Sequence, residues 1–262
     1  MCPISTALPP MSRLENRTAL VTGAGSGIGR CVCEVLAADG ARVVAADCNE
    51  DAAHETVSTL VGGAGRHLAL HVDVSSEASV KSLFSRIRDS PGLPAVSIVA
   101  CCAGVKNIDS VVDTKPEAFD RVISVNLKGT FLTVQAAASE MLSRGVRKGA
   151  VVTLSSVVAR TGLSRQCAYA ASKAAIVAFT KTAALELAPH GIRCNVVMPG
   201  FTDTSMTADV SDKDRACVVA RTPLGRAAQP EEIARAVRFL CDEVDSSFVT
   251  GAALDVTGGL HM

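Results

Sequence analysis

Short runs of apolar residues alternate along the chain with longer stretches in which apolar residues recur at helical spacing. The short runs are rich in Val, Ile, Ala and Leu without in-and-out alternation, which is typical of strands buried on both faces of a parallel sheet. These strands are expected at 18–22, 41–47, 67–74, 95–104, 149–156, 192–200 and 252–259. Helices are expected at 29–40, 50–61, 79–89, 116–143, 167–187 and 231–242. The order predicts an α/β fold, a single-domain doubly wound parallel sheet (Rossmann-type) with helices on both faces.

The organisation is that of one domain with a short leading arm. Residues 1–16 (MCPISTALPPMSRLEN) are interpreted as a flexible arm, and its mixture of Arg13 and Glu15 makes a poor transit peptide. Residues 17–262 form the predicted domain, with neither an internal repeat nor a linker. No apolar run reaches the ~18–20 residues that cross a bilayer, so we expect no membrane span.

Charge and composition exclude several classes of protein. Lys plus Arg and Asp plus Glu both total 26, which leaves no basic surplus for nucleic acid or an anionic membrane. With no Trp and one Tyr there is no aromatic platform for bases. The ten cysteines form no C-x-x-C pair and the five histidines form no H-x-x-x-H pair on an expected helix, so we expect reduced thiols and no metal site.

A glycine-rich loop, TGAGSGIG (22–29), joins the first expected strand to the first expected helix. Gly23, Gly27 and Gly29 follow G-x-x-x-G-x-G rather than the usual G-x-G-x-x-G. Glycines allow a tight turn and a close backbone approach, and the helix N-terminus offers free N–H groups to a pyrophosphate. The loop therefore predicts a dinucleotide site.

An acid at the end of the second strand indicates which dinucleotide. Asp47 stands 18 residues after Gly29, where a carboxylate accepts hydrogen bonds from ribose hydroxyls and repels a 2′-phosphate. Cys48 and the two residues after it provide no cation, so NAD is preferred over NADP. Arg30 is the nearby cation and is expected to be solvated. Asp73, after the third strand, either meets the adenine edge or caps a helix.

The only tyrosine, Tyr169, lies four residues before Lys173 in YAASK, on one face of an expected helix. Taken alone, the pair also fits an amphipathic helix with a surface lysine. The catalytic interpretation is that the ammonium lowers the pKa of the phenol from about 10 by ~3 units, so that Tyr169 exchanges a proton with substrate.

TGAGSGIG together with YAASK resembles the signature pair of the short-chain dehydrogenase/reductase family, and the likeness covers the chain from about residue 17 to its end. VNLKG, the serine pair 155–156, FTDTSM and RTPLGRAAQPEEIA extend it. The resemblance implies a nicotinamide-dependent oxidoreductase whose catalytic residues are Asn126, Ser156, Tyr169 and Lys173. From the residues alone, Ser156 is equally a strand-end cap and Asn126 a hydrogen bond at a helix kink.

The same resemblance extends the cofactor site beyond the glycine loop. The residues expected to contact NAD are Gly23, Gly25, Ser26, Gly27, Ile28, Asp47, Cys48, Asp73, Val74, Ala103, Gly104, Tyr169, Lys173, Pro199, Gly200, Thr202 and Thr204. Substrate is expected to meet Ser156 and Tyr169. The chain departs from the family where Cys101-Cys102 replaces an Asn pair that helps to brace the sheet.

Within the family the chain most resembles 3-oxoacyl-carrier-protein reductases and type 8 17-beta-hydroxysteroid dehydrogenases. This implies a 3-hydroxyacyl thioester or a 17-beta-hydroxysteroid as substrate, in fatty acid or steroid metabolism. The polar stretch 202–226 is interpreted as a substrate lid, with Met206, Val210, Val218 and Val219 either lining a pocket or simply packing. The basic cluster Arg144, Arg147 and Lys148 either docks an acidic carrier or the phosphates of coenzyme A, or is a solvated helix end.

The resemblance also implies an assembly and a location. Relatives form tetramers through their long helices, or heterotetramers with a carbonyl reductase type 4-like subunit in the mitochondrial matrix. An alternative function follows, a non-catalytic NAD-binding scaffold subunit of such a reductase, and the alternative location is the cytoplasm.

Overall fold

The computed structural model describes residues 13–261, which contain a seven-stranded parallel sheet in the order β3-β2-β1-β4-β5-β6-β7. The strands are β1 (Thr18–Thr22), β2 (Arg42–Asp47), β3 (Leu68–His71), β4 (Val96–Cys101), β5 (Gly149–Leu154), β6 (Ile192–Pro199) and β7 (Ala253–Val256). The strand order reverses between β1 and β4, so their carboxyl ends flank a crevice. The predicted fold class is confirmed.

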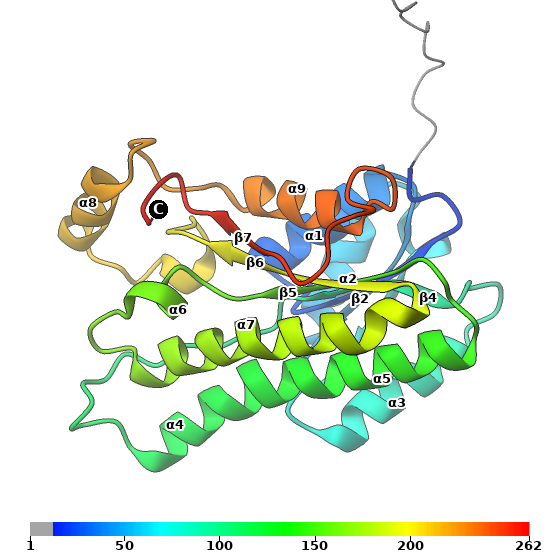
Figure 1. Ribbon diagram of the computed structural model, residues 1–262, viewed down its shortest axis with the longest axis horizontal. Coiled ribbons are helices and arrows are strands. Elements are labelled where there is room, and N and C mark those ends of the chain that lie inside the picture. Colours follow the sequence, from blue (N-terminus) through cyan, green and yellow to red (C-terminus); the bar gives the residue numbers. More distant parts are fainter. Residues whose placement is uncertain (1–12, 262) are drawn as a thin grey trace, which may run out of the picture.

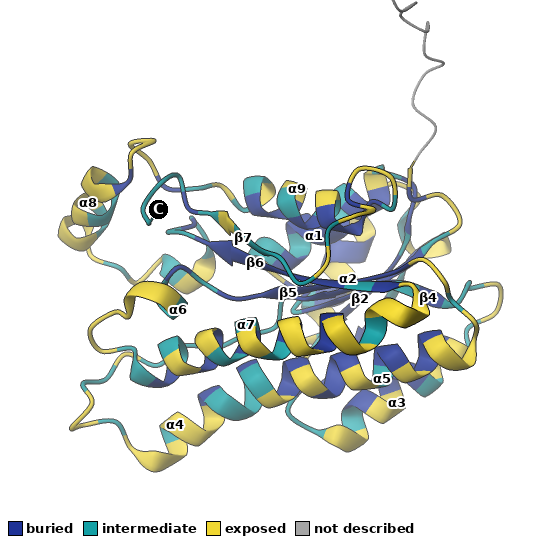
Figure 2. Ribbon diagram, viewed as in Figure 1, coloured by how far each residue is buried: buried dark blue, intermediate teal, exposed yellow. Residues whose placement is uncertain are grey.

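Helices cover both faces of the sheet (Figure 1). On one face lie α1 (Gly27–Ala38), α2 (Glu50–Thr59) and α9 (Pro230–Cys241), and on the other lie α3 (Glu77–Arg88), α5 (Gly129–Ser143) and α7 (Cys167–Leu187). Residues of β1 alternate between the two cores: Ala19 and Val21 pack on the first face and Leu20 on the second. All are buried, which accounts for the uninterrupted apolar runs; Figure 2 shows the buried sheet between half-exposed helices.

The long helix expected at 116–143 is divided in three. The chain forms α4 (Pro116–Val122), then a π-helical segment (Ile123–Lys128), then α5. Gly129 lies just after the π-helical segment, and a Cβ there would meet Val74 at 2.7 Å, so α5 approaches the end of β3 closely at this point. π-Helical insertions are frequent at functional sites, and this one contains Asn126.

Residues 1–12 of the N-terminal arm expected at 1–16 lie outside the described residues. The four residues that follow are packed on the domain. Leu14 is fully buried and donates its N–H to the Asp39 carbonyl, and the Arg13 guanidinium pairs with Asp242 and Asp245. Residues of the predicted arm that the structure describes therefore contact the domain through Arg13 and Leu14.

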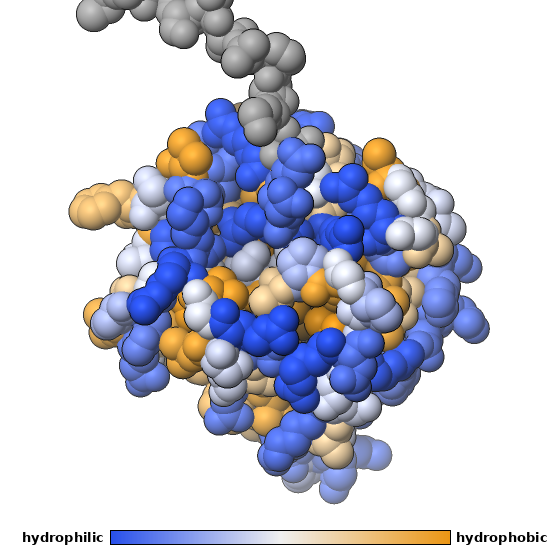
Figure 3. All heavy atoms as spheres, turned by 90° about the vertical axis from the view of Figure 1, so that its right-hand side faces the viewer, coloured by the Kyte–Doolittle hydropathy of each residue, from blue (hydrophilic) through white to orange (hydrophobic). Residues whose placement is uncertain are grey.

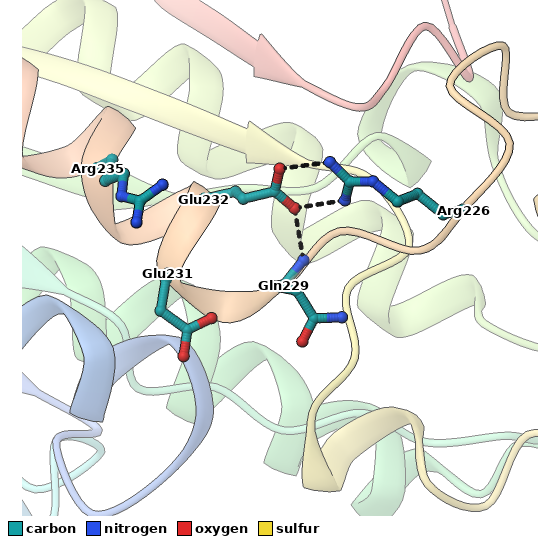
Figure 4. Close-up of a pocket in the computed structure, with 5 residues that line it drawn as sticks. All are labelled: Arg226, Gln229, Glu231, Glu232 and Arg235. Atoms are coloured by element: carbon teal, nitrogen blue, oxygen red, sulfur yellow. Dashed lines mark hydrogen bonds and ion pairs between the residues drawn. The ribbon is translucent and has the colours of Figure 1, made fainter.

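The polar stretch before α9 contains a helix of its own, α8 (Asp212–Arg221), none of whose residues is buried. The stretch ends where Glu232 caps α9, accepting a hydrogen bond from the Gln229 N–H at 2.8 Å and two from Arg226 at 2.6 and 2.7 Å (Figure 4). Hydrogen bonding with Arg226 lowers the pKa of Glu232 to about 2. The small pocket that these residues line together with Glu231 and Arg235 is therefore a helix cap, closed by the Arg226–Glu232 ion pair.

The basic cluster Arg144, Arg147 and Lys148 follows the end of α5 and precedes β5, at the amino edge of the sheet. Lys148 pairs there with Glu243 at 2.8 Å. Figure 3 shows this end of the molecule, which is mostly hydrophilic with apolar side chains between the charges. Because the carboxyl edge is the opposite one, the geometry favours a solvated helix end for this cluster. Within 13–261 no helix is long and apolar enough to cross a membrane.

Candidate active site

A cleft of 1580 Å³ opens at the carboxyl ends of the strands. It runs from the glycine loop, past the end of β4, to the segments around α6 (Val158–Thr161) and α8. It is lined by every residue predicted for the cofactor or for catalysis except Gly25 and Asn126, which lie behind its wall. Segments far apart in the sequence therefore meet in one site.

The glycine loop needs glycine at two positions because neighbouring backbone atoms leave no room there for a side chain. Gly23 has a left-handed φ of +69°, and a Cβ on it would stand 2.6 Å from the Ala103 nitrogen. A Cβ on Gly29 would lie 2.0 Å from the Gly23 carbonyl oxygen. Ser26 is the N-cap of α1 but its side chain makes no capping hydrogen bond with the described chain, so the first N–H groups of α1 remain available at the cleft.

Asp47 links the loop to β2. One carboxylate oxygen accepts a hydrogen bond from the Gly25 N–H at 2.9 Å, and the other accepts one from the Asn49 N–H at 2.9 Å. Cys48 follows it, exposed on the cleft wall. Gly25 therefore acts by fixing the carboxylate rather than by lining the cleft.

Arg30 is only partly solvated, with 36% of its side chain exposed. Its guanidinium donates to the Gly25 carbonyl at 2.6 Å and to the Thr56 hydroxyl at 3.1 Å, and it pairs with Glu55 at 3.4 Å. The expectation of a solvated side chain holds only in part, because α2 packs beside α1 and supplies partners that spacing along the chain does not reveal. Arg30 braces the loop from behind and is absent from the cleft lining.

Asp73 lines the cleft and also closes a turn. Its carboxylate accepts hydrogen bonds from the Ser75 N–H at 2.9 Å and the Ser75 hydroxyl at 2.7 Å, whereas the N-cap of α3 is Ser76. Val74, next to it, packs against Gly129. Both alternatives for Asp73 are thus partly met: it stabilises the turn before the helix and faces the cleft.

The two serines after β5 differ in their surroundings. Ser155 is buried and its hydroxyl donates to the Lys173 carbonyl at 2.7 Å, which ties β5 to α7. Ser156 lines the cleft together with Tyr169, and its hydroxyl oxygen accepts a hydrogen bond from the Val158 N–H at 3.4 Å. Ser156 therefore faces substrate and caps the turn as well.

Tyr169 and Lys173 share a face of α7, with the lysine Nζ 5.6 Å from the centroid of the ring. Lys173 is 5% exposed, its ammonium donates to the Leu154 carbonyl at 2.7 Å, and burial lowers its pKa to about 8. Burial raises the pKa of Tyr169, and the hydrogen bond with Ser156 lowers it in part. The prediction that Lys173 lowers the pKa of the Tyr169 phenol is thus wrong for the protein without cofactor. Burial of the phenol raises its pKa, and this is the larger effect.

Asn126 is fully buried in the π-helical segment. Its side-chain oxygen accepts from the Val105 N–H at 2.8 Å, and its amide donates to the Val105 carbonyl at 2.9 Å and to the Ser172 hydroxyl at 3.1 Å. Its own carbonyl accepts from Thr130 at 2.6 Å, a hydrogen bond of the helix kink. Asn126 therefore positions the chain after β4 against α7 rather than touching the cleft.

The chain after β4 still reaches the cleft surface, although Cys101 and Cys102 stand where the family has an Asn pair. Cys101 is buried, burial raises the pKa of its thiol to about 12, and the Cys102 N–H donates to the Thr22 carbonyl at 3.1 Å. A Cβ on Gly104 would lie 3.4 Å from the Asn126 side-chain oxygen and 3.6 Å from the Lys173 Nζ. The thiols pack as small apolar groups, and Ala103–Gly104 stay at the cleft surface.

After β6 the chain folds back over the glycine loop. Pro199 ends β6, and the Gly200 N–H donates to the Val256 carbonyl at 2.9 Å. The Thr202 hydroxyl donates to the Gly200 carbonyl at 3.1 Å, and the Thr204 methyl lies 3.4 Å from where a Cβ on Gly27 would stand. These residues close one side of the cleft.

The stretch 202–226 supplies the outer wall of the cleft. Met206, Val210 and Val218 line it, whereas Val219 does not. Asp209 reaches across to Lys106, in the chain after β4, at 2.6 Å. Reasoning from sequence missed Lys106, Arg121 and Arg165 as cleft residues, because no motif or spacing distinguishes them from surface cations.

Comparison with known proteins agrees with this geometry. The family model described as enoyl-(acyl carrier protein) reductase matches residues 23–261. The (3R)-3-hydroxyacyl-CoA dehydrogenase of Canis lupus familiaris is 45% identical over 95% of this chain and 98% of its own length, and that of Homo sapiens is 43% identical over 96% and 98%. The 3-oxoacyl-acyl-carrier-protein reductase FabG of Escherichia coli (strain K12) is 38% identical over 95% and 98%.

Solved structures show the same architecture. The crystal structure of a short-chain type dehydrogenase/reductase from Mycobacterium marinum superposes with a TM-score of 0.89 at 33% identity, covering 95% of this chain and 97% of that one. A putative gluconate dehydrogenase from Agrobacterium tumefaciens gives a TM-score of 0.89 at 29% identity, covering 96% and 98%. The similarity extends over the whole domain and not only over its nucleotide-binding half.

Proposed function

Because the chain belongs to the short-chain dehydrogenase/reductase family of nicotinamide-dependent oxidoreductases, we propose that it transfers hydride between NAD and the 3-hydroxy or 3-oxo group of an acyl thioester. One observation carries the proposal. Ser156, Tyr169 and Lys173 converge on the same cleft as the glycine loop, although Ser156 follows β5 and the other two residues lie on α7. A reacting carbon held there has a proton donor beside it and a dinucleotide cradle next to it.

The residues present fit NAD. Gly23 and Gly29 allow the tight backbone packing that forms the loop, the N-terminus of α1 offers N–H groups to pyrophosphate, and Asp47 offers a carboxylate to the ribose hydroxyls. Ala103, Gly104, Pro199, Gly200, Thr202 and Thr204 would hold the rest of the cofactor. A negative Asp47 without a cationic neighbour in the cleft lining supports NAD over NADP.

Three side chains of the protein carry out the proton transfer to the substrate oxygen. In reduction, the Tyr169 hydroxyl gives its proton to the substrate oxygen, and the raised pKa of the phenol keeps it protonated for that step. Ser156 donates a hydrogen bond to the same oxygen and orients it. With a pKa of about 8, Lys173 is largely an ammonium near neutrality and favours the phenolate that remains. A bound nicotinamide supplies the hydride or receives it.

Tyr169→Phe is the decisive test. We expect turnover of a 3-hydroxyacyl-CoA with NAD to fall about 10²- to 10⁴-fold, the usual contribution of a general acid–base group. NADH binding, followed by fluorescence titration, should stay unchanged because the phenyl ring remains. Equal turnover by the variant and the wild type would rule out the assigned mechanism.

The acyl thioester is proposed over the 17-beta-hydroxysteroid because the relatives are named for hydroxyacyl and oxoacyl substrates. The apolar wall of Met206, Val210 and Val218 suits an acyl chain and a steroid equally. A panel of both substrates, each with NAD and NADP, separates them by kcat/KM.

The scaffold alternative makes a different prediction. A non-catalytic subunit binds NADH but oxidises nothing unless a carbonyl reductase type 4-like partner is added. Exposed apolar side chains on α5 and α7, namely Phe131, Leu142 and Leu185, support a tetramer built through these helices. Sizing the protein alone and with that partner tests the assembly, and the mitochondrial location remains a prediction that imaging in cells can test.

A further inference from the structure

The two halves of the cleft differ in charge. Near the glycine loop its ionisable side chains are Asp47 and Asp73, both acidic. Beyond β4, apart from Lys173, the lining contains Lys106, Arg121, Arg165 and Arg221 together with Asp209 and Asp214. Lys106 and Asp209 pair with each other at 2.6 Å, and Asp214 accepts from Ser211 at the start of α8. The three guanidinium groups at the substrate end are left without a matching acid.

These three arginines come from separate elements. Arg121 lies in the last turn of α4, Arg165 in the loop between α6 and α7, and Arg221 is the last residue of α8. All three are exposed. Arg165 has a left-handed φ of 66°, and its guanidinium donates to the Ile108 carbonyl at 3.3 Å. Folding thus gathers cations that are far apart in the sequence.

Elsewhere the fold pairs many of its arginines with acids. Carboxylate partners within 4 Å are found for Arg13, Arg30, Arg86, Arg88, Arg160, Arg215, Arg226 and Arg238. Among residues 13–261, Arg121, Arg165 and Arg221 have no such partner. Like charges gathered at the mouth of a cleft raise the local concentration of an anionic ligand.

We propose that Arg121, Arg165 and Arg221 bind the phosphate groups of coenzyme A, and so select a coenzyme A thioester as the substrate. This rests on the proposed function and deepens it. A guanidinium group presents paired donors that match phosphate oxygens, and coenzyme A carries three phosphates at the end remote from its thioester. The apolar lid residues Met206 and Val210 line the same half of the cleft and accept the acyl chain.

The test compares one acyl group on two thiols. Arg121→Gln, Arg165→Gln and Arg221→Gln are assayed with a 3-hydroxyacyl-CoA and with the same acyl group on pantetheine, which has no phosphate. We expect KM for the coenzyme A thioester to rise about 10- to 100-fold for each variant, the worth of one charged hydrogen bond. KM for the pantetheine thioester should not change, and the preference for coenzyme A should weaken as salt is raised.

The matched control is Arg144→Gln with Arg147→Gln, two arginines at the opposite edge of the sheet. Binding of free coenzyme A to wild type and to the triple cleft variant, followed by calorimetry, tests the inference independently of turnover. Loss of this binding in the triple variant supports it. The inference is overturned if the triple variant binds coenzyme A as tightly as the wild type, or if the control variant loses as much coenzyme A binding. It is also overturned if KM for the pantetheine thioester rises as much as KM for the coenzyme A thioester, or if only KM for an acyl-carrier-protein thioester rises.

Discussion

The cofactor half and the substrate half of the cleft are built in different ways. In the cofactor half, backbone segments are in direct contact. Gly23 packs against Ala103, and Gly29 packs against Gly23, with no room for a Cβ at either glycine. In the substrate half, α8 has no buried residue; the Lys106–Asp209 ion pair links the wall to the chain after β4, and the Arg215–Asp203 ion pair lies within the wall. The first half is fixed by close packing, and the second by solvated side chains whose contributions are small.

Substitution of Gly29 should have the largest effect, because it breaks the packed half directly. In Gly29→Ala the new methyl group would stand 2.0 Å from the Gly23 carbonyl oxygen, so the loop and α1 must separate. We expect NADH affinity to fall more than ~100-fold and the free energy of unfolding to drop by roughly 1–3 kcal/mol. Fluorescence titration and chemical denaturation measure the two effects.

Gly65→Ala is the matched control, since nothing lies within 4 Å of a Cβ there. It should leave both quantities unchanged. If Gly29→Ala binds NADH as tightly as Gly65→Ala, the close packing of the cofactor half is not what forms the site.

Removing the charge of Asp47 should have an intermediate effect and sharpens the comparison within the packed half. In Asp47→Ala, the ribose hydroxyls lose their acceptor and a 2′-phosphate is no longer repelled. We expect the ratio of kcat/KM for NAD to that for NADP to fall about 10- to 100-fold, the scale of one charge interaction near a protein surface. Asp51→Asn, an exposed acid in the first turn of α2, controls for net charge. An unchanged ratio in Asp47→Ala would remove the basis for preferring NAD.

The smallest effect is expected in the solvated half. Asp209→Asn removes the partner of Lys106, and an exposed ion pair contributes only ~0.2–1 kcal/mol. KM for substrate should rise about 2- to 5-fold while NADH affinity stays constant. A double-mutant cycle with Lys106→Met measures the coupling, with Asp212→Asn as the control at an exposed acid of α8. A coupling above ten-fold, or a loss of NADH binding, would contradict the division of the cleft.

The same contrast explains how far sequence could predict this protein. The strands, the helices and the glycine loop follow local rules of apolar spacing and backbone freedom, so their positions could be predicted to within a few residues. Tyr169 and Lys173 could be placed on one helix face by the spacing of i and i+4 alone.

Features that depend on partners distant in sequence could not be predicted. The hydrogen bonds of Arg30 to Gly25 and Thr56 need α2 beside α1, and the π-helical segment at Asn126 is followed by the close packing of Gly129 on Val74. The pKa of Tyr169 depends on burial, which the spacing to Lys173 does not contain. The cluster of Arg121, Arg165 and Arg221 exists only once three elements meet at the cleft.

The isolated tyrosine has a practical consequence. The chain has no tryptophan and one tyrosine, and that phenol faces the cleft. The tyrosine band in the absorbance and emission of the bare protein therefore arises from the residue assigned to proton transfer. An alkaline spectrophotometric titration of the native protein would read the ionisation of Tyr169 directly, without a label and without a background to subtract.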